Sequence, residues 1–505
     1  MMNFTPIFRR ALRTVVPLSE MTGESTRRLQ ERQWEWLVLN GRKTLFGEKH
    51  GISDIRTYDD FTRNVPVVEY PAIRDMVMRM VDGEKDILWP GATRRFAQSS
   101  GTSDGKSKYI PLTADSLSRC HYRGSSYVVA HYMNLYPQSR IFSGKGLILG
   151  GSYGNALHLK PGVKVGDLSA HLIDGINPVV NLFRVPSKKT ALLENWEEKL
   201  PRLVSESMAA DVTNLSGVPS WFLTVIKEVI RMAGCDTIHD VWPNLEVFFH
   251  GGISFGPYRR EYERLTDSKR MRYLETYNAS EGFFAVQTTR DPSEGMELLM
   301  DLGTFYEFVP LDELDDPHPR ALRAWEVTPG EIYALAITSC NGLWRYLPGD
   351  TVKILSMYPL RIAIAGRTRH YINAFGEELM VFNADEAIKR ATEKCGCHVA
   401  NYTACPVFAE GGHRGRHQWL IEFSTPPADM DEFAAELDKA LTEENSDYQA
   451  KRSGNIFLDP LSITVAQQGL FDDWLASTGK LGGQRKVPRL SNNRAIMDAM
   501  LKMNK

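Results

Sequence analysis

The sequence is poor in cysteine and has no long hydrophobic run, and these two absences exclude several classes of protein. Six cysteines among 505 residues are too few for a scaffold held by disulfides. No apolar stretch reaches the roughly 18–20 residues that a helix needs to cross a bilayer. The first residues also lack the apolar core of a signal peptide. We therefore expect a cytoplasmic protein with no membrane partner.

An excess of charge of one sign is missing as well. The formal net charge is -2, which gives no global reason to expect a nucleic acid or an anionic membrane as partner. The composition is that of a globular protein, with 43% hydrophobic and 24% charged residues. At about 100–200 residues per domain, the length allows two to four domains. Any phosphate binding must therefore depend on local lysines.

Hydroxyls, glycines and ammonium groups are concentrated in one run of ten residues: Ser99-Ser100-Gly101-Thr102-Ser103-Asp104-Gly105-Lys106-Ser107-Lys108. The glycines let the backbone turn its N–H groups inward, and the hydroxyls and lysines supply donors and charge. This chemistry predicts a loop that holds the phosphates of a nucleoside triphosphate. Only three residues separate Gly101 from Gly105, whereas a Walker A loop has four. A solvated surface turn is the alternative.

Two further segments suit a bound nucleotide. In Tyr277-Asn278-Ala279-Ser280-Glu281-Gly282, a carboxylate beside a hydroxyl fits Mg²⁺, which binds through one or two carboxylates and substrate phosphates. The tyrosine there either stacks on a purine or simply packs at a strand edge. In the segment 344–350, Pro-Gly-Asp precedes an alternating strand. Such an aspartate is an acceptor for the two hydroxyls of a ribose, or only part of a turn.

A fourth segment lies near the C-terminus, over 478–490, where glycines flank several lysines. A mobile loop of this kind can bring a cation to developing phosphate charge and leave again. A frayed basic tail is the ordinary alternative.

In their order and separations, these four segments resemble the auxin-responsive Gretchen Hagen family of acyl acid-amido synthetases. That family is related to the acyl-adenylate-forming enzymes, which include acyl-CoA ligases and firefly luciferase. The loop that begins at Ser99 is similar to the family's first nucleotide motif, the stretch 279–281 to its second and the turn 346–350 to its third. Lys486-Val487-Pro488-Arg489 is similar to its C-terminal lysine motif.

The resemblance implies a ligase that uses ATP and Mg²⁺ to join a small carboxylic acid to an amine, such as an amino acid, through an acyl-adenylate. It implies catalytic roles for Lys486, in the transition state of adenylation, and for Glu281, on Mg²⁺. It also implies a set of nucleotide-binding residues: Ser99, Ser100, Gly101, Thr102, Ser103, Gly105, Lys106, Tyr277, Ser280, Asp350 and Arg367.

The fold class that follows is α/β, with a large N-terminal α/β domain of adenylate-forming type and a smaller, mobile α+β C-terminal lid domain. We expect the adenylation domain over 1–365, a hinge over 366–376 and the lid over 377–505. The chain departs from the wider adenylate-forming pattern at Arg369, where many relatives carry an aspartate. Within the large domain, hydrophobic spacing predicts helices over 25–39 and 114–135, strands over 144–149 and 245–249, and a segment over 192–230 that is helical in pieces.

Candidates for the acyl pocket carry no motif. Arg123, Tyr127 and His131 share one face of the helix expected over 114–135, and Tyr153 and His250 stand beside glycines. An arginine there would meet a carboxylate. A solvated helix face and simple strand ends are the commoner explanations for such residues.

Three alternatives stay open. The acyl group of the adenylate can pass to a thiol, on CoA or on a carrier protein, instead of to an amine. A non-catalytic nucleotide-binding protein is another class, although Glu281, Asp350 and Lys486 are all present. Finally, Cys395, Cys397, His398 and Cys405 are residue types that bind zinc, but their spacing matches no paired knuckle.

Overall fold

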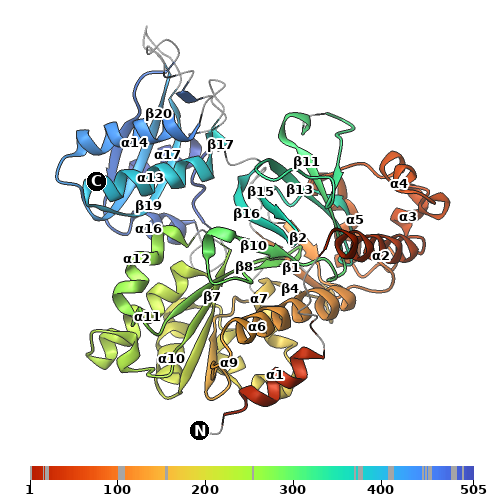
Figure 1. Ribbon diagram of the computed structural model, residues 1–505, viewed down its shortest axis with the longest axis horizontal. Coiled ribbons are helices and arrows are strands. Elements are labelled where there is room, and N and C mark those ends of the chain that lie inside the picture. Colours follow the sequence, from red (N-terminus) through yellow and green to blue (C-terminus); the bar gives the residue numbers. More distant parts are fainter. Residues whose placement is uncertain are drawn as a thin grey trace. The chain divides into compact units, whose positions relative to one another are not determined.

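The structure is a computed structural model of the chain. It describes residues 3–14, 16, 22–99, 108–153, 157, 159–252, 255–314, 316–368, 371–372, 379–407, 415–445, 448–449, 452, 458–478, 486–491 and 494–504. The chain divides into two compact units (Figure 1), one formed by 1–255, 259–348 and 353–363 and the other by 256–258, 349–352 and 364–505. Within the described ranges, no helix is both long and apolar enough to cross a membrane.

A mixed sheet of thirteen strands dominates the described part of the chain. Its path runs β12 (Leu322–Arg323), β11 (Thr304–Pro310), β13 (Ile332–Ser339), β15 (Asp350–Met357), β16 (Leu360–Arg367), β10 (Met296–Leu298), β9 (Gly282–Val286), β8 (Arg272–Ala279), β7 (Val247–Gly251), β6 (Val212–Gly217), β3 (Lys145–Ile148) and β5 (Arg184–Val185), while β14 (Leu343–Tyr346) pairs with β13. The five strands from β8 to β5 are parallel. Their carboxyl ends therefore meet at one edge of the sheet.

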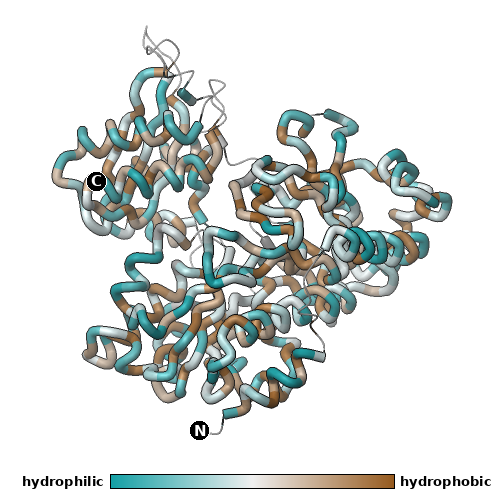
Figure 2. The backbone as a smooth tube through the Cα atoms, viewed as in Figure 1, coloured by the Kyte–Doolittle hydropathy of each residue, from teal (hydrophilic) through white to brown (hydrophobic). Residues whose placement is uncertain are grey.

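The helices of the first unit are α1 (Thr5–Arg13), α2 (Gly23–Gly41), α3 (Leu45–Lys49), α4 (Tyr58–Asn64), α5 (Tyr70–Val81), the π-helix η2 (Ser116–Tyr122), α6 (Arg123–Leu135), α7 (Leu168–Asp174), α8 (Pro178–Asn181), α9 (Lys188–Ala191), α10 (Trp196–Met208), α11 (Pro219–Ala233) and α12 (Gly256–Leu265). Brown and teal alternate along them in Figure 2, as expected for helices with one face against a sheet.

Adjacent residues of β7 show that helices cover both faces of the parallel strands, because successive side chains point to opposite faces. Phe248 packs on Phe222 of α11 and Tyr262 of α12, with ring centroids 5.0 and 5.3 Å away. Phe249 packs edge-to-face on Tyr132 of α6 at 5.4 Å. β7 is buried on both sides, which explains its apolar run Val-Phe-Phe.

A second, three-stranded sheet consists of β1 (Arg95–Ser99), β2 (Lys108–Pro111) and β4 (Lys164–Gly166). β1 and β2 are antiparallel and pair out to Ser99 and Lys108. β4 runs parallel to β1 and pairs as far as Ala97. The run predicted to hold phosphate thus leaves β1 and enters β2 at neighbouring positions.

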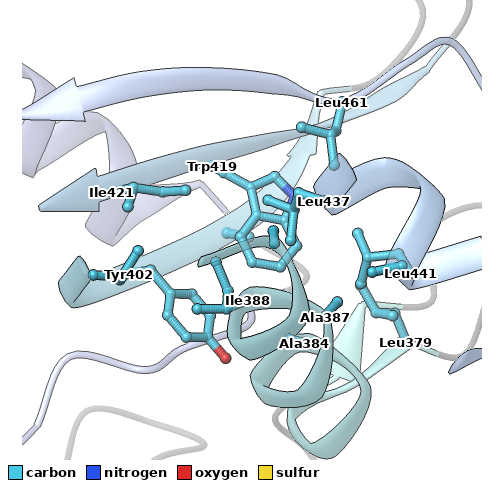
Figure 3. Close-up of a cluster of buried hydrophobic side chains, with 14 of the residues drawn as sticks. Leu379, Ala384, Ala387, Ile388, Tyr402, Trp419, Ile421, Leu437, Leu441 and Leu461 are labelled. Carbon is cyan, nitrogen blue, oxygen red and sulfur yellow. The ribbon is translucent and has the colours of Figure 1, made fainter. Parts of the chain in front are cut away.

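The second unit is a small α+β structure. Strands β19 (His398–Val407), β20 (Arg416–Thr425) and β21 (Ser462–Ala466) form its sheet, next to a short pair, β17 (Tyr371–Ile372) and β18 (Leu379–Met380). Its helices are α13 (Val381–Cys395), α14 (Met430–Glu444), α16 (Leu470–Ser477) and α17 (Ala495–Met503). Figure 3 shows the core between α13, α14 and one face of the sheet, with Trp419 at its centre. Leu420 points to the opposite face, where it joins a second cluster with α16 and α17.

The α/β fold class is confirmed: the described chain has mixed sheets with helices, divided between a large N-terminal unit and a smaller C-terminal one. The expected helices over 25–39 and 114–135 and the strands over 144–149 and 245–249 correspond to α2, η2 with α6, β3 and β7. The segment 192–230 is helical in pieces, as expected, since α10 and α11 lie in it, but the strand β6 between them was not predicted. The sequence of β6, Val-Thr-Asn-Leu-Ser-Gly, is half polar, and its place in the sheet depends on pairing with β3 and β7.

Candidate active site

The predicted phosphate loop lies outside the described residues, and the strands β1 and β2 flank it in the sequence. Positions 100–107 are not described, and neither is the side chain of Ser99. These positions include all of the predicted loop ligands. The flanking strands are tied down on both sides: β1 pairs with both β2 and β4, and the backbone N–H of Tyr109 donates to the Tyr70 hydroxyl at 2.9 Å.

The second motif forms the tight turn of a β-hairpin. Ala279 pairs with Gly282, so Ser280 and Glu281 alone connect β8 to β9. Both are largely buried, with 5% and 7% of their surface exposed. Tyr277 is also buried and packs edge-to-face on Phe284 at 4.9 Å. The turn stands at the carboxyl edge of the parallel strands, where open α/β sheets bind their ligands.

The helix that follows the phosphate loop contacts the hairpin that carries Glu281. The backbone N–H of Phe283 donates to Cys120 Sγ at 3.1 Å. A Cβ added to Gly124 would lie 2.4 Å from Cγ of Phe283, so only glycine allows this close packing. The π-helical turn Ser116–Tyr122 also places the buried His121 beside Asn278 of β8. Single π turns inside helices often occur at functional sites.

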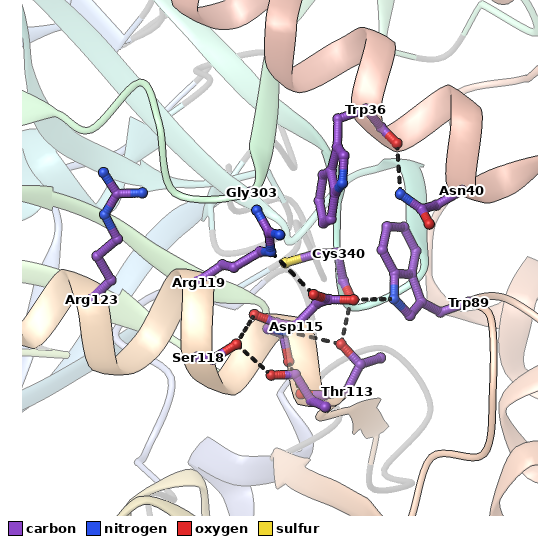
Figure 4. A network of polar contacts seen from close by, with 12 residues as sticks. Trp36, Asn40, Trp89, Thr113, Asp115, Ser118, Arg119, Arg123, Gly303 and Cys340 are labelled. Atoms are coloured by element: carbon purple, nitrogen blue, oxygen red, sulfur yellow. Dashed lines mark hydrogen bonds and ion pairs between the residues drawn. The ribbon is translucent and has the colours of Figure 1, made fainter.

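The same stretch of chain also contacts the strand pair that leads to the third motif. Thr113 Oγ1 donates to the Cys340 carbonyl at 2.6 Å, and Asn341 Nδ2 donates to the Pro111 carbonyl at 2.9 Å. Figure 4 shows this contact together with Asp115, which accepts hydrogen bonds from Trp89 and Arg119. Thus one segment, from β2 to the π-helix, touches the elements that carry the second and third motifs.

A buried ion pair fixes the approach to the third motif. Arg345 in β14 has a positive φ of 44°, and its Nε lies 2.9 Å from Glu307 Oε1, with side chains only 4% and 0% exposed. The Tyr58 hydroxyl donates to the same carboxylate at 2.7 Å. Arg345 also donates to the Val65 carbonyl at 2.8 Å. The turn that ends at Asp350 therefore begins from a rigid anchor.

The candidates for the acyl pocket separate into two groups. Arg123 and Tyr127, on α6, both donate to the carboxylate of Asp301, at 2.6 and 2.7 Å. His131 is next on the same helix face, with its ring 6.0 Å from that of Tyr127. Burial lowers the pKa of His131 to about 4.

The other two candidates lie at the carboxyl edge of the parallel strands. Tyr153 follows β3, and its hydroxyl donates to Asp174 at 3.1 Å. His250 belongs to β7 and stacks on Phe255 at 4.2 Å. Burial lowers the pKa of His250 to about 3, and the nearby Arg259 adds to this effect. The sheet thus brings His250 to the same edge as Glu281, whereas Tyr153, beyond the end of β3, contacts α7.

Three residues that the sequence did not single out shape this region. Asp301 binds Arg123 and Tyr127, Asn278 neighbours His121, and Lys199 is buried with its Nζ 2.6 Å from the Gly150 carbonyl. Burial lowers the pKa of Lys199 to about 8. Asn278 lies within the second motif, whereas no local pattern marks Asp301 or Lys199, because each bonds to a partner far away in the sequence.

Two more predicted residues lie near the boundary between the units or beyond it in the chain. The side chain of Arg367 lies outside the described residues, as do positions 373–378 of the expected hinge. Lys486 is described and exposed, in the second unit. Among the described residues, no group of three or more His, Cys, Asp or Glu side chains is arranged to bind a metal.

Comparison with known proteins gives the family. The models of the GH3 family match almost end to end: the N-terminal domain at 19–187 and 176–271, the central domain at 297–367 and the C-terminal domain at 382–495. The chain belongs to the GH3 family. This confirms the resemblance to the Gretchen Hagen enzymes.

Similar curated proteins of the GH3 family come from plants. The chain is 24% identical to the indole-3-acetic acid-amido synthetase GH3.8 of Oryza sativa subsp. indica, over 91% of this chain and 87% of that protein. It is also 24% identical to the 4-substituted benzoates-glutamate ligase GH3.12 of Arabidopsis thaliana, over 94% of both chains.

Solved structures show the same fold at lower sequence identity. GH3.15 acyl acid amido synthetase in complex with 2,4-DB superimposes with a TM-score of 0.80 at 19% identity, over 99% of this chain and 96% of the other. An open conformation of 2-hydroxyisobutyryl-CoA ligase, in complex with 2-HIB-AMP and CoA, gives 0.56 at 13% identity, over 88% and 89%. The GH3 chain thus has the fold of the adenylate-forming enzymes.

Proposed function

We propose that this GH3 protein is an ATP-dependent acyl acid-amido synthetase. In the first step, a carboxylate oxygen of the acid attacks the α-phosphorus of ATP, and pyrophosphate leaves. In the second step, an amine nitrogen, most simply that of an amino acid, attacks the acyl carbon. The amine loses a proton, AMP leaves, and an amide remains. The related GH3.8 and GH3.12 are named for ligations of this kind.

One observation carries the proposal. A single segment, from β2 through the π-helix, contacts both the β8–β9 hairpin with Ser280 and Glu281 and the strand pair that leads to Asp350. These contacts support a shared nucleotide site, because they link the strand after the phosphate loop to the second motif and to the strands that precede the third.

The roles of the residues follow from charge. Every step of adenylation gathers negative charge at the phosphates, so preorganised donors and cations lower its barrier. We assign the phosphates to the loop from Ser99 to Lys106, the purine to Tyr277 and the ribose hydroxyls to Asp350. Ser280 completes the phosphate site, and Lys486 stabilises the transition state of adenylation.

A divalent cation fits this arrangement. Glu281 offers a carboxylate next to the Ser280 hydroxyl in one rigid turn, and Mg²⁺ takes one or two carboxylates plus substrate phosphates in sites of this type. Mg²⁺ held there would neutralise phosphate charge. The protein supplies the fixed carboxylate, and the burial of the turn keeps that carboxylate in place.

The division of the chain into two compact units supports a mechanism with a lid domain. We propose that residues 1–365 form the adenylation domain and that residues 377–505 close and reopen over it through the hinge at 366–376, where Arg367 meets the nucleotide. Ligand sites often lie between domains. Motion of the lid between the two half-reactions would let the amine enter after pyrophosphate has left.

Transfer to a thiol is the second candidate, because 2-hydroxyisobutyryl-CoA ligase shares the fold. The acyl acid and its acceptor are set by the pocket, and Arg123, Tyr127, His131, Tyr153 and His250 are its proposed polar lining. Of these, His250 lies at the same sheet edge as Glu281, which favours it as a contact for the acid.

Acid-dependent exchange of labelled pyrophosphate into ATP tests the proposal. We would assay a panel of aromatic, fatty and hydroxy acids, add amino acids and thiols to each active mixture, and identify the products by mass. Exchange followed by an amide supports the proposal, whereas a thioester moves the enzyme to the second candidate. A protein that binds ATP without exchange in the presence of any acid would contradict both.

A further inference from the structure

The segment that carries Lys486 is bound to the edge of the second unit's sheet. Leu490 forms a parallel bridge with Ala404 of β19. The N–H of Ala404 donates to the Arg489 carbonyl at 2.8 Å, and the N–H of Ser491 donates to the Ala404 carbonyl at 3.0 Å. Leu490 is fully buried in the core of that unit. The segment therefore behaves as a short added strand and not as a frayed tail.

The side chain of Arg489 ties this added strand to the helix beneath it. Its Nη1 lies 2.5 Å from Asp385 Oδ1 of α13. Its guanidinium also covers the ring of Tyr402, with Cζ 4.8 Å from the ring centre. The Tyr402 hydroxyl donates to the same Asp385 oxygen at 2.7 Å. The three groups form one closed cluster, defined here as the Arg489 clamp.

The chemistry of the clamp requires arginine. A planar guanidinium can stack on an aromatic ring and bind a carboxylate at the same time, whereas the compact ammonium of lysine cannot do both well. Burial raises the pKa of Tyr402 well above its usual range, so its hydroxyl remains a donor to Asp385. Both charged side chains are only about one-fifth exposed, so solvent weakens their attraction less than at the surface.

Arg489 of the clamp lies three residues after Lys486, which is the first residue of the described segment 486–491. Between them, Val487 packs against the second core cluster, and the Pro488 carbonyl accepts a hydrogen bond from Thr403 Oγ1 at 2.6 Å. Every residue from 487 to 491 is thus held, while Lys486 is exposed. The backbone position of Lys486 therefore depends on the anchored residues that directly follow it in the chain.

We propose that Arg489 is a positioning residue for adenylation: with Asp385 and Tyr402, it holds the added strand that carries Lys486. Arg489 contacts no substrate in this role and acts only through the lysine. The inference rests on the proposed function, in which Lys486 stabilises the transition state. A catalytic group displaced by about 1 Å loses on the order of 100-fold in rate, so the clamp has a measurable effect.

The test is a double-mutant cycle on the full-length protein, measured by acid-dependent pyrophosphate exchange. The variants are Arg489→Met, Lys486→Ala and the double variant. We expect Arg489→Met to lower kcat about 10- to 100-fold and to change KM for ATP less than twofold. On the Lys486→Ala background, the same change should have no further effect, because the group it positions is absent.

Two controls separate positioning from general loss of structure. Arg452→Met breaks another partly buried ion pair of the same unit, the one with Asp438 at 2.6 Å, and should leave kcat within about twofold of the wild type if only stability changes. Tyr402→Phe keeps the ring under Arg489 but removes one hydrogen bond to Asp385. It should lower kcat by about 3- to 10-fold, and it tests the clamp even if Arg489→Met does not fold.

Three outcomes would overturn the inference. Equal losses in Arg489→Met and Arg452→Met would make the clamp merely structural. Multiplicative losses in the double variant would show that Arg489 acts independently of Lys486. An unimpaired Lys486→Ala would remove the proposed role of the lysine and, with it, the inference. The first two leave the proposed function intact, so the two failures are distinguishable.

Discussion

Replacing Arg345 by methionine should weaken the first unit more than any surface change, because it leaves the Glu307 carboxylate charged and buried. Glu307 is fully buried, and of its charged partners in the described part of the chain only Arg345 lies at bonding distance, 2.9 Å from Oε1. The Tyr58 hydroxyl would remain, but one neutral donor does not balance a full charge. Breaking such a pair typically costs about 3–5 kcal/mol.

The double variant Arg345→Met/Glu307→Leu gives the sharper test. Removing both charges avoids the uncompensated carboxylate, and buried pairs replaced by apolar residues are often neutral in stability. We therefore expect the double variant to recover at least about 2 kcal/mol of the loss. Both variants keep a side chain at the positive φ of position 345, so backbone strain cancels in the comparison.

Hydrogen exchange provides the assay, since two units need not unfold in one transition. Peptides from β11 and β14 report the free energy of opening around the pair. Arg79→Met serves as the control, because it breaks the exposed pair with Glu84 and should leave protection of both strands unchanged. Equal protection in Arg345→Met and Arg79→Met would refute the reasoning, as would a double variant less stable than Arg345→Met.

Three further predictions concern the site. Glu281→Ala should abolish acid-dependent pyrophosphate exchange, whereas the control Glu294→Ala, at an exposed position, should retain it. Exchange by the Glu281→Ala variant would remove the assignment of Glu281 to Mg²⁺. Burial lowers the pKa of His121 to about 4, so the folded state loses about 3 kcal/mol of stability from this group as the pH falls from 6.5 to 4. His121→Phe should therefore flatten the curve of unfolding free energy against pH in this range. An unchanged slope would contradict a buried neutral ring. Tyr127→Phe should lower stability by about 1 kcal/mol, through the lost bond to Asp301, and leave KM for ATP unchanged; a large rise in that KM would show that α6 contributes to the nucleotide site.

The sequence by itself identified the family, because nucleotide chemistry needs particular residue types close together in a loop. The Ser/Gly/Lys run, the Ser280–Glu281 pair and the Pro-Gly-Asp turn are all local patterns, and their order and spacing are independent of tertiary structure. Hydrophobic periodicity likewise predicted helices such as α2 and α6, whose apolar faces repeat along the chain.

Only the tertiary structure decided which distant residues come into contact with one another. β6 has a half-polar sequence and becomes a strand because β3 and β7 flank it. Arg123 was a candidate for binding an acid, and the fold places it on Asp301, 178 residues away. Arg489 meets Asp385 across 104 residues. Partners so far apart leave no periodic trace in a single sequence, because their proximity is created by packing and not by local backbone geometry.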